Sequence, residues 1–361
     1  MNITNTNTVL WIASSSISNT KKNYIYDLYN DKEELLYNIV NYKLNMLSLK
    51  EMEELIRSFN KENINAISQR IKEEELKYLL YGEEDYPKEF YNIEEPPFII
   101  FYKGSLDIFK NKKVSIVGAR NCTTYGKEVT KYIVKELSSY NINTVSGGAR
   151  GIDTIAHLTS IENRSKTLAV LGCGIDIVYP KENLRLFKDI EKNGLILSEF
   201  LPGTPPINYN FPQRNRLISA LGDIVIIIEG SNKSGTLITA SHALKQGKDV
   251  MAVPGPVYSE LSKGCNKLIR DGAYPFTEIE DVLSLLKINK NSNKLKEENN
   301  KAENNTLKER IYNIIRNEPM HIDTIVKITN IDIKVLYELL FELQFEERIL
   351  ALNGNFYVKA I

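Results

Sequence analysis

The sequence predicts an α/β fold: a parallel-sheet core with a small N-terminal helical domain and a C-terminal winged-helix domain. The main observation lies between Val114 and Thr239, where four apolar runs each break into a loop rich in Gly, Ser, Asn and Arg. These runs and loops are VSIV with GARNCTTYG, NTV with SGGARGID, TLAVL with GCGID, and DIVIII with EGSNKSGT. A helical pattern follows each loop, and such alternation is typical of buried parallel strands.

The loops after parallel strands gather at one edge of a sheet, and folds of this class bind ligands there. Here they would bring backbone N–H groups, helix N-termini and several arginines together, and all three suit phosphate. The sequence therefore predicts a site for a polyanion or a nucleotide at this edge.

The composition limits the class of protein. At 361 residues and 42% apolar, the chain has room for two or three domains with a substantial core. Lys plus Arg equal Asp plus Glu at 46 each, so an anion-binding surface must be a local patch. Cys122, Cys173 and Cys265 are far apart, which argues against a disulfide framework or a zinc site. Without a signal-peptide pattern or a membrane-length apolar run, we expect a soluble, cytoplasmic protein.

The N-terminal region, residues 1–82, is expected to be a small separate helical domain. From about Lys21 to Leu80 the chain is charged and has apolar residues at helical spacing, such as Leu47, Met52 and Leu55. Proline-containing segments then lead into FIIFY, a strand that opens the α/β core of residues 83–286.

The C-terminal region divides into a linker and a compact domain. Residues 287–305 are rich in Lys, Asn and Glu with almost nothing apolar, which predicts a disordered linker. Residues 306–361 show two helices, a longer third helix and RILAL-NG-NFYV, where Asn353-Gly354 predicts a type I′ hairpin. This order outlines a winged helix. Its third helix, about 332–347, would read a DNA groove, but it carries five acids against Lys334, so we interpret the domain as a protein-interaction or autoregulatory module.

The turn after the first core strand is Gly118-Ala119-Arg120-Asn121, and Arg120 would stand at the sheet edge within reach of a phosphate. The alternative is that Arg120 pairs with an acidic neighbour. The dehydrogenase pattern of three spaced glycines is absent here, and Gly172-Cys173-Gly174 is only a weak match to it.

The loop SGGARGID, residues 146–153, opens directly onto a helix. Its glycines permit positive φ values, so that successive N–H groups would form an anion nest at the positive end of the helix dipole. A purely structural turn is the alternative, but it would seldom need Ser146, Gly147, Gly148, Arg150 and Gly151 together.

Two further segments carry candidate binding residues. Phe211 precedes Arg214 and Arg216 at a predicted helix start. One arginine would bind phosphate and the other would brace the loop. Phe211 either stacks on a base or packs under the loop. Lys233-Ser234-Gly235-Thr236 opens another helix, as an anion site or as a simple cap.

Taken in order, GARNCTTYG, SGGARGIDTIAH, GCGIDIVYPKEN, FPQRNRLISAL, SGTLITASHAL, GKDVMAVPG and GCNKLIRDGA closely resemble the DNA-processing protein A family, DprA or Smf. The resemblance covers about Tyr86 to Leu286. It implies an extended Rossmann-like domain that binds single-stranded DNA, protects incoming DNA in natural transformation and helps load the RecA recombinase. It also implies a homodimer, no established catalytic reaction and no cofactor.

Carried onto this chain, the resemblance makes Arg120 a phosphate-binding arginine in a pocket shared with the glycine loop, Phe211 and both later arginines. The expected DNA-binding set is Arg120, Asn121, Ser146, Gly147, Gly148, Arg150, Asn208, Phe211, Arg214, Asn215, Arg216, Lys233, Ser234, Gly235 and Thr236.

The chain departs from the family pattern in two places. Asn208 stands where many members have a lysine, which removes one expected phosphate contact. Residues 21–80 contain no glycine, so a glycine-rich helix-hairpin-helix for duplex DNA is not expected there, and an interaction or spacer role is favoured.

Two other functions fit parts of the sequence. A Rossmann-like phosphoribohydrolase would need a catalytic glutamate on the helix after Thr236, but LITAS follows instead. His157 is a candidate base, although a lone histidine in such a helix is more often packed or capping. A sensor of a small nucleotide would use the same pocket.

Overall fold

The computed structural model describes residues 5–28, 32–41, 43–44, 46–288 and 307–360. The chain divides into two compact units, Met1–Ile288 and Asn289–Ile361. The predicted disordered linker, 287–305, lies outside the described residues except for Lys287 and Ile288.

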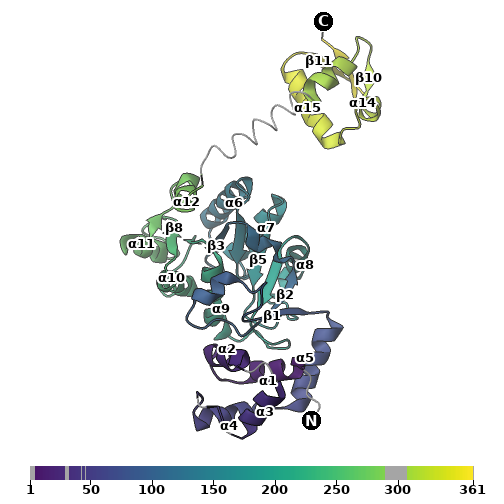
Figure 1. Ribbon diagram of the computed structural model, residues 1–361. Helices are drawn as coiled ribbons and strands as arrows, with labels where there is room; N and C mark the ends of the chain where they lie inside the picture. The colour runs from purple at the N-terminus through teal and green to yellow at the C-terminus, as the bar shows by residue number, and fades with distance from the viewer. Residues whose placement is uncertain (1–4, 29–31, 42, 45, 289–306, 361) are drawn as a thin grey trace. The chain divides into compact units, whose positions relative to one another are not determined.

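Within the first unit, the described residues form a nine-stranded sheet in the order β1-β2-β6-β5-β4-β3-β7-β8-β9 (Figure 1). Strands β3 to β9 pair in parallel, whereas β1 and β2 add an antiparallel edge. The strands are β1 Lys77–Leu80, β2 Ile99–Gly104, β3 Lys113–Val117, β4 Asn143–Ser146, β5 Thr167–Val170, β6 Leu195–Ser198, β7 Ile224–Ile227, β8 Asp249–Ala252 and β9 Tyr274–Pro275. The predicted α/β class is confirmed: VSIV and NTV lie within β3 and β4, and TLAVL and DIVIII contain β5 and β7.

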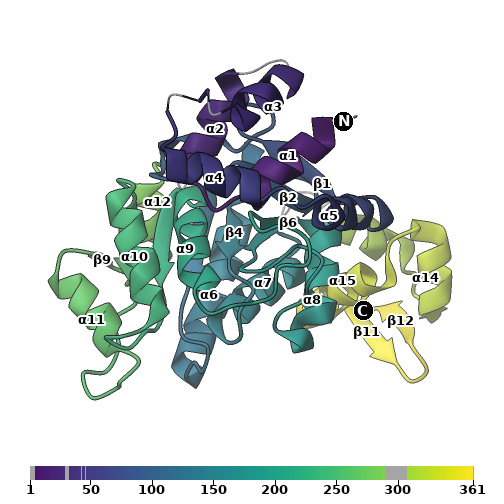
Figure 2. The same cartoon turned by 90° about the horizontal axis from the view of Figure 1, so that it is seen from below.

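Every residue of β3, β4, β5 and β7 is buried, as expected for strands covered on both faces. Helices α9 and α10 pack with one face of the sheet, and α6, α7 and α12 pack with the other. Figure 2 shows α9 and α10 side by side. The helices of this core are α6 Thr124–Ser139, α7 Ile152–Glu162, α8 Leu184–Asn193, α9 Asn210–Leu221, α10 Gly235–Lys245, α11 Lys263–Arg270 and α12 Ile279–Leu285. The short 3-10 helices are Lys88–Asn92, Leu106–Lys110 and Lys181–Asn183.

The strand order changes direction between β3 and β7. From β3 the chain adds β4, β5 and β6 on one side, and it then returns to place β7, β8 and β9 on the other. The loops after β3 and β7 therefore diverge onto opposite faces and leave a crevice at the carboxyl ends of these strands. A doubly wound sheet binds its ligand at this switch point.

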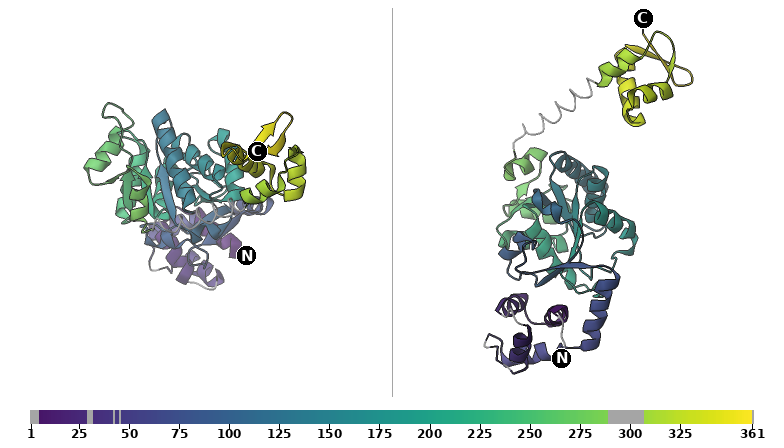
Figure 3. Two further views of the ribbon diagram at one scale, coloured as in Figure 1. Left: turned by 90° about the horizontal axis from the view of Figure 1, so that it is seen from above. Right: turned by 45° about the vertical axis from the view of Figure 1, so that its right-hand side comes forward.

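The N-terminal helices gather at one end of the sheet (Figure 3). They are α1 Asn5–Ser14, α2 Asn19–Leu28, α3 Lys32–Val40, α4 Leu49–Arg57 and α5 Lys61–Glu73. Trp11 and Leu55 belong to the same apolar cluster as Phe98 and Phe101 of the sheet region, and the Trp11 indole donates to the Leu55 carbonyl at 2.8 Å. The boundary at residue 82 stays a prediction, because these helices share a core with the sheet.

Residues 77–80 correct the helical expectation for the N-terminal region. They form β1, in which Lys77 pairs with Tyr102 and Leu80 with Ile99. A four-residue segment has too little periodicity to reveal its state, and pairing with β2 decides it.

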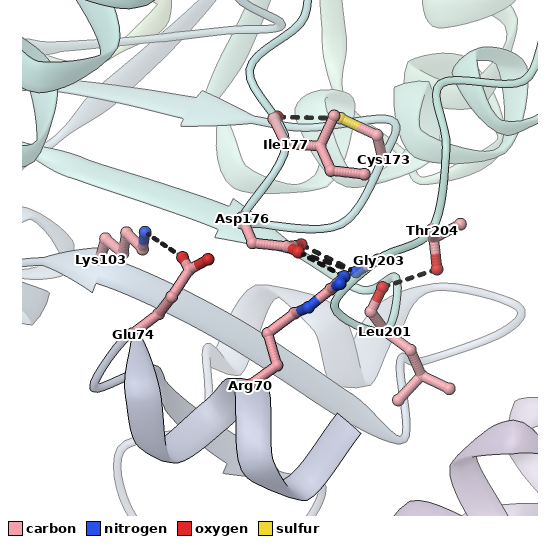
Figure 4. Close-up of polar contacts among 9 residues, drawn as sticks. All are labelled: Arg70, Glu74, Lys103, Cys173, Asp176, Ile177, Leu201, Gly203 and Thr204. Carbon is pink, nitrogen blue, oxygen red and sulfur yellow. Dashed lines mark hydrogen bonds and ion pairs between the residues drawn. The ribbon is translucent and has the colours of Figure 1, made fainter. Parts of the chain in front are cut away.

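Polar contacts tie α5 to the loops after β5 and β6 (Figure 4). Arg70 of α5 lies 3.0 Å from the Asp176 carboxylate, which also accepts the Gly203 N–H at 2.9 Å. Beside them, Lys103 of β2 pairs with Glu74 at 3.4 Å. The last N-terminal helix is therefore anchored to the loop GCGID, which follows β5 at the edge where the sequence predicts a site.

The second unit is a winged helix, as predicted. A helix over 307–314 is followed by β10 Met320–His321, α14 Ile322–Thr329, α15 Ile333–Phe345, β11 Ile349–Leu352 and β12 Phe356–Lys359. The strands pair in the order β10-β12-β11. The predicted third helix is α15, capped by Asp332, whose side chain accepts the Lys334 N–H.

The hairpin turn differs from the predicted two-residue type I′ turn. Leu352 pairs with Phe356, which leaves the three residues 353–355 in the loop. Positive φ values fall at Gly354 (83°) and Asn355 (61°), since Asn tolerates the left-handed region better than most residues do.

Candidate functional site

A cavity of about 310 Å³ lies at the switch point between β3 and β7. The turn after β3, the start of α9 and the start of α10 supply its walls. Of the predicted binding residues, those that line it are Arg120, Asn208, Phe211, Arg214, Asn215, Ser234, Gly235 and Thr236. Arg120, Phe211 and Arg214 also line a smaller neighbouring hollow of about 40 Å³. The glycine loop contributes Ala149 and Asp153 to the larger cavity and Gly147 and Arg150 to the smaller one, so the structure brings all four sequence motifs together at the predicted edge.

Arg120 and Phe211 stand at the centre of this arrangement. The Arg120 guanidinium lies over the Phe211 ring, 5.4 Å from its centroid, and Arg120 is exposed while Phe211 is half-buried. A guanidinium above an aromatic face is attracted by the ring quadrupole. The Arg120 side chain is therefore held above an aromatic ring yet remains open to solvent.

Tyr179 adds a second ring that the sequence analysis missed. Its ring lies 5.5 Å from that of Phe211 at an interplanar angle of 39°, and the residue is 41% exposed. Gly172 leaves room for the Phe211 ring itself, because a Cβ there would come within 2.8 Å of that ring. An available signal was the aromatic residue directly before Pro180, in the loop that follows a core strand.

Arg214 is buried rather than presented to solvent. It is 4% exposed, and its Nη1 donates to the Gly147 carbonyl at 2.7 Å and to the Val170 carbonyl. Burial lowers the pKa of Arg214 to about 10, and the Asp153 carboxylate opposes that shift, so the guanidinium stays charged at neutral pH. Arg214 joins the loop after β4 to the last residue of β5, and its direct contact with a phosphate stays a prediction.

The glycine loop does not present the open anion nest that was predicted. The buried Asp153 carboxylate accepts the N–H groups of Gly147 at 3.2 Å and Ala149 at 3.3 Å. The chain therefore supplies its own anion at the start of α7. The prediction of an open nest was wrong at these two amides. Burial raises the pKa of Asp153, while Arg214 and the two N–H groups oppose that shift.

Other members of this loop also have internal roles. Ser146 is fully buried and donates to the Ile116 carbonyl at 2.7 Å, which leaves no surface for a ligand. Gly148 has a φ of +66°, and a Cβ there would come within 2.7 Å of Phe187. Arg150 is the exposed member, and its Nη2 donates to Glu182 at 2.9 Å.

Arg216 corrects the expectation that both later arginines share one pocket. Residues two apart on a helix point in different directions. Arg216 pairs with Glu199, the two side chains being 15% and 9% exposed, and it lines a separate cavity of about 950 Å³ with Lys22. Arg216 therefore braces the region between α9 and the loop after β6.

At the start of α10, Ser234 is the N-cap and accepts the Thr236 N–H at 3.0 Å. Thr236 is buried, whereas Lys233 and Gly235 are exposed. Asn215 donates to the Gly235 carbonyl at 3.4 Å, so α9 and α10 meet across the cavity. The simple cap is present, and a ligand contact at Lys233 or Gly235 stays a prediction, as does one at the exposed Asn121.

His157 is packed in the core. It is fully buried, and its Nδ1 lies 2.7 Å from the Thr167 hydroxyl. Burial lowers its pKa to about 3, with the charge of Arg214 adding to the shift. His157 is not among the residues that line either hollow at the switch point.

The described part of the chain gathers no three or more His, Cys, Asp or Glu side chains as a set that could bind a metal. None of its helices combines the length and apolar character that crossing a membrane requires.

The family model for DNA recombination-mediator protein A matches residues 77–287. The chain belongs to this family. A second family model, the DprA winged helix domain, matches residues 296–355. The resemblance on which the sequence interpretation relied is therefore confirmed.

Named relatives agree with this assignment. The chain is similar to DNA processing protein DprA of Streptococcus pneumoniae, at 43% identity over 199 residues that cover 55% of this chain and 70% of the relative. It is similar to Protein Smf of Escherichia coli, at 36% identity over 56% of this chain and 54% of the relative.

Solved structures of family members are also similar. The X-ray structure of Streptococcus pneumoniae DprA has a TM-score of 0.66 at 33% identity and covers 79% of this chain and 98% of its own. Helicobacter pylori DNA processing protein A, studied for its single-stranded DNA binding mode, has a TM-score of 0.54 at 33% identity. It covers 58% of this chain and 95% of its own.

Proposed function

We propose that this DprA-family protein binds single-stranded DNA at the switch-point edge, protects incoming strands and helps load a RecA-type recombinase during natural transformation. It acts by binding, as a homodimer, and not by catalysing a reaction. The observation that carries the proposal is the exposed Arg120 guanidinium above Phe211. A cation beside an aromatic face supplies the two contacts that single strands use, a phosphate contact and a base stack.

The surroundings support single strands over duplex DNA. Phe211 and Tyr179 offer ring surface to an unstacked base, which a paired base inside a duplex cannot reach without being extruded. The arrangement shows no pattern of side chains for reading base edges, so we expect little dependence on sequence. The relative from Helicobacter pylori, for which a single-stranded DNA binding mode is described, supports the same reading.

The hydrolase alternative has weaker support. Asp153 is the one carboxylate among the residues that line the 310 Å³ cavity, and it is buried against the Gly147 and Ala149 amides. A general acid or base must reach the substrate. The first turn of α10 after Thr236 supplies no carboxylate either.

A competition experiment tests the proposal. A labelled single-stranded oligonucleotide bound to the full chain is challenged with unlabelled single strand, matched duplex or mononucleotides. We expect only the single strand to displace the label efficiently. Equal displacement by mononucleotides would favour the sensor, and release of nucleobase or phosphate would favour the hydrolase.

A loading assay tests the second step of the proposal. RecA-dependent ATP hydrolysis is followed on single strands covered by single-strand-binding protein. The chain should shorten the lag before hydrolysis begins, and Arg120→Ala should lengthen it again. An unchanged lag would confine the function to DNA binding and protection.

A further inference from the structure

Helix α15 carries a row of large apolar side chains that the winged helix does not bury. Ile333, Tyr337, Phe341 and Phe345 are 46%, 43%, 69% and 84% exposed. Their spacing of four residues places them on one side of the helix. We call these four residues the α15 stripe.

The stripe is not needed for the core of the domain. The inward side of α15 supplies Leu336, Leu339, Leu340 and Leu343, all buried in the cluster that joins α15 to α14 and the hairpin. Single exposed apolar residues are normal on a protein surface. A continuous row that ends in two exposed phenylalanines is instead typical of a surface that binds a partner.

Acidic residues run beside the stripe and define the chemistry of that partner. Glu338, Glu342 and Glu346 are exposed and again four residues apart. Lys308 pairs with Glu342 at 3.3 Å and with Glu346 at 2.7 Å, whereas Glu338 forms no ion pair among the described residues. Phosphate would be repelled by this row. A second copy of α15 packed antiparallel about a two-fold axis would place its acidic row on the same side as the first, where the two rows would repel each other.

We propose that the α15 stripe is a docking surface for an amphipathic helix of a partner protein, with large apolar residues on one face and Lys or Arg beside them. From Ile333 to Phe345 the stripe spans about 18 Å, at about 1.5 Å per residue. The partner helix therefore needs about three turns. Its apolar face covers Phe341 and Phe345, and its basic residues pair with the acidic row.

Peptide binding to the full chain tests this proposal. The probes are two synthetic 18-residue helices of about five turns, both with leucines at spacings of three and four; one has lysines and the other glutamates at the remaining positions. Fluorescence anisotropy should show binding of the Leu/Lys peptide and none of the Leu/Glu peptide. Phe341→Ser with Phe345→Ser should weaken binding at least tenfold, and Glu338→Lys several-fold.

Matched changes on another exposed helix serve as controls. Leu158 of α7 is 41% exposed and Glu162 is exposed, so Leu158→Ser and Glu162→Lys repeat both kinds of substitution away from α15. Neither should alter peptide affinity. Thermal unfolding checks the folding of each variant, and Phe345→Ser alone, at the most exposed position, replaces the pair if the pair unfolds.

Four results would overturn the proposal. The first two are equal binding of both peptides and unchanged peptide binding by the phenylalanine variants. The third is a loss of affinity for duplex DNA in those variants. The fourth is that the chain binds neither peptide and that the phenylalanine variants sediment as a smaller oligomer than the wild type. The last two would assign the stripe to DNA or to a second copy of the chain.

Discussion

The Arg120 guanidinium lies 5.4 Å from the centroid of the Phe211 ring. Arg120 follows β3, and Phe211 lies in the first turn of α9. The two residues are 91 positions apart, and the switch between β3 and β7 brings them together. Arg214 is a second arginine beside this ring, but the two differ in burial: Arg120 is exposed, whereas Arg214 is buried. Arg120 is therefore the cation best placed to receive a phosphate.

Replacing Arg120 with Ala should weaken single-strand binding about ten- to a hundred-fold, because a charge-assisted contact is worth about 1.5–3 kcal/mol. Stability should change little, since the side chain is exposed. Fluorescence anisotropy and urea unfolding measure the two effects. Lys135→Ala, on the exposed side of α6, is the control and should leave affinity unchanged. An equal loss in both variants would mean that Arg120 contributes only general charge.

Replacing Phe211 with Leu should reduce affinity for single strands by about five- to a hundred-fold, because stacking on an aromatic ring is worth about 1–3 kcal/mol per base. Leucine keeps apolar contact with Gly172 and removes the ring. Quenching of a fluorescent base analogue in the strand should be lost as well. The same change at the exposed Tyr37 of α3 should alter neither signal. Retained quenching in Phe211→Leu would place the base elsewhere.

Arg214→Ala should mainly destabilise the fold. The substitution leaves the Gly147 and Val170 carbonyls without their donor and the buried Asp153 without its neighbouring charge. Breaking a buried charged interaction by removing one partner costs about 3–5 kcal/mol. Urea unfolding should show this loss, with a lower midpoint than for Arg120→Ala. Equal midpoints for the two variants would contradict the bracing role.

Asn208→Lys should tighten binding at low salt and steepen the dependence of log K on log salt by about 0.7, which is one phosphate for a single strand. Asn208 is exposed on the rim of the 310 Å³ cavity, so an added cation there can reach the backbone of a bound strand. Matched salt titrations compare it with Asn313→Lys in the winged-helix unit, which should act weakly. An unchanged slope for Asn208→Lys would show that this loop faces away from the DNA.

His157 should make stability fall between pH 7 and pH 5. Its folded pKa is lowered to about 3, so as the pH drops below about 6.5 the unfolded chain gains a proton that the folded chain does not. The contribution amounts to about 2 kcal/mol over this range. Urea unfolding of His157→Gln should show a flatter pH dependence than the wild type. Parallel curves for wild type and His157→Gln would contradict the burial of a neutral imidazole.

The sheet, and the edge at which its loops gather, could be predicted because their signals are local. Apolar runs that end in Gly-rich loops identify β3, β4, β5 and β7, and the periodicity and turn residues after Thr306 identify the winged helix. The strand β1 could not be found in the same way, since its state depends on pairing with β2.

The partners of buried polar groups could not be predicted. The sequence shows that amides and arginines approach one edge, but it does not show that Asp153 occupies the Gly147 and Ala149 amides. It also does not show which arginine points outward, because the direction of Arg214 depends on carbonyls 67 and 44 residues away. Tertiary contacts therefore decide which members of a correct motif remain free for a ligand.

The most direct test of the account is a salt titration of single-stranded and matched duplex DNA with the wild type and Arg120→Ala. With about three to five phosphates neutralised, the wild type should prefer the single strand and show a slope of log K against log salt of about −2 to −3.5. Arg120→Ala should make that slope shallower by about 0.7. Equal affinity for duplex DNA, a wild-type slope near zero, or the same slope in both proteins would contradict a single-strand site at Arg120 and Phe211.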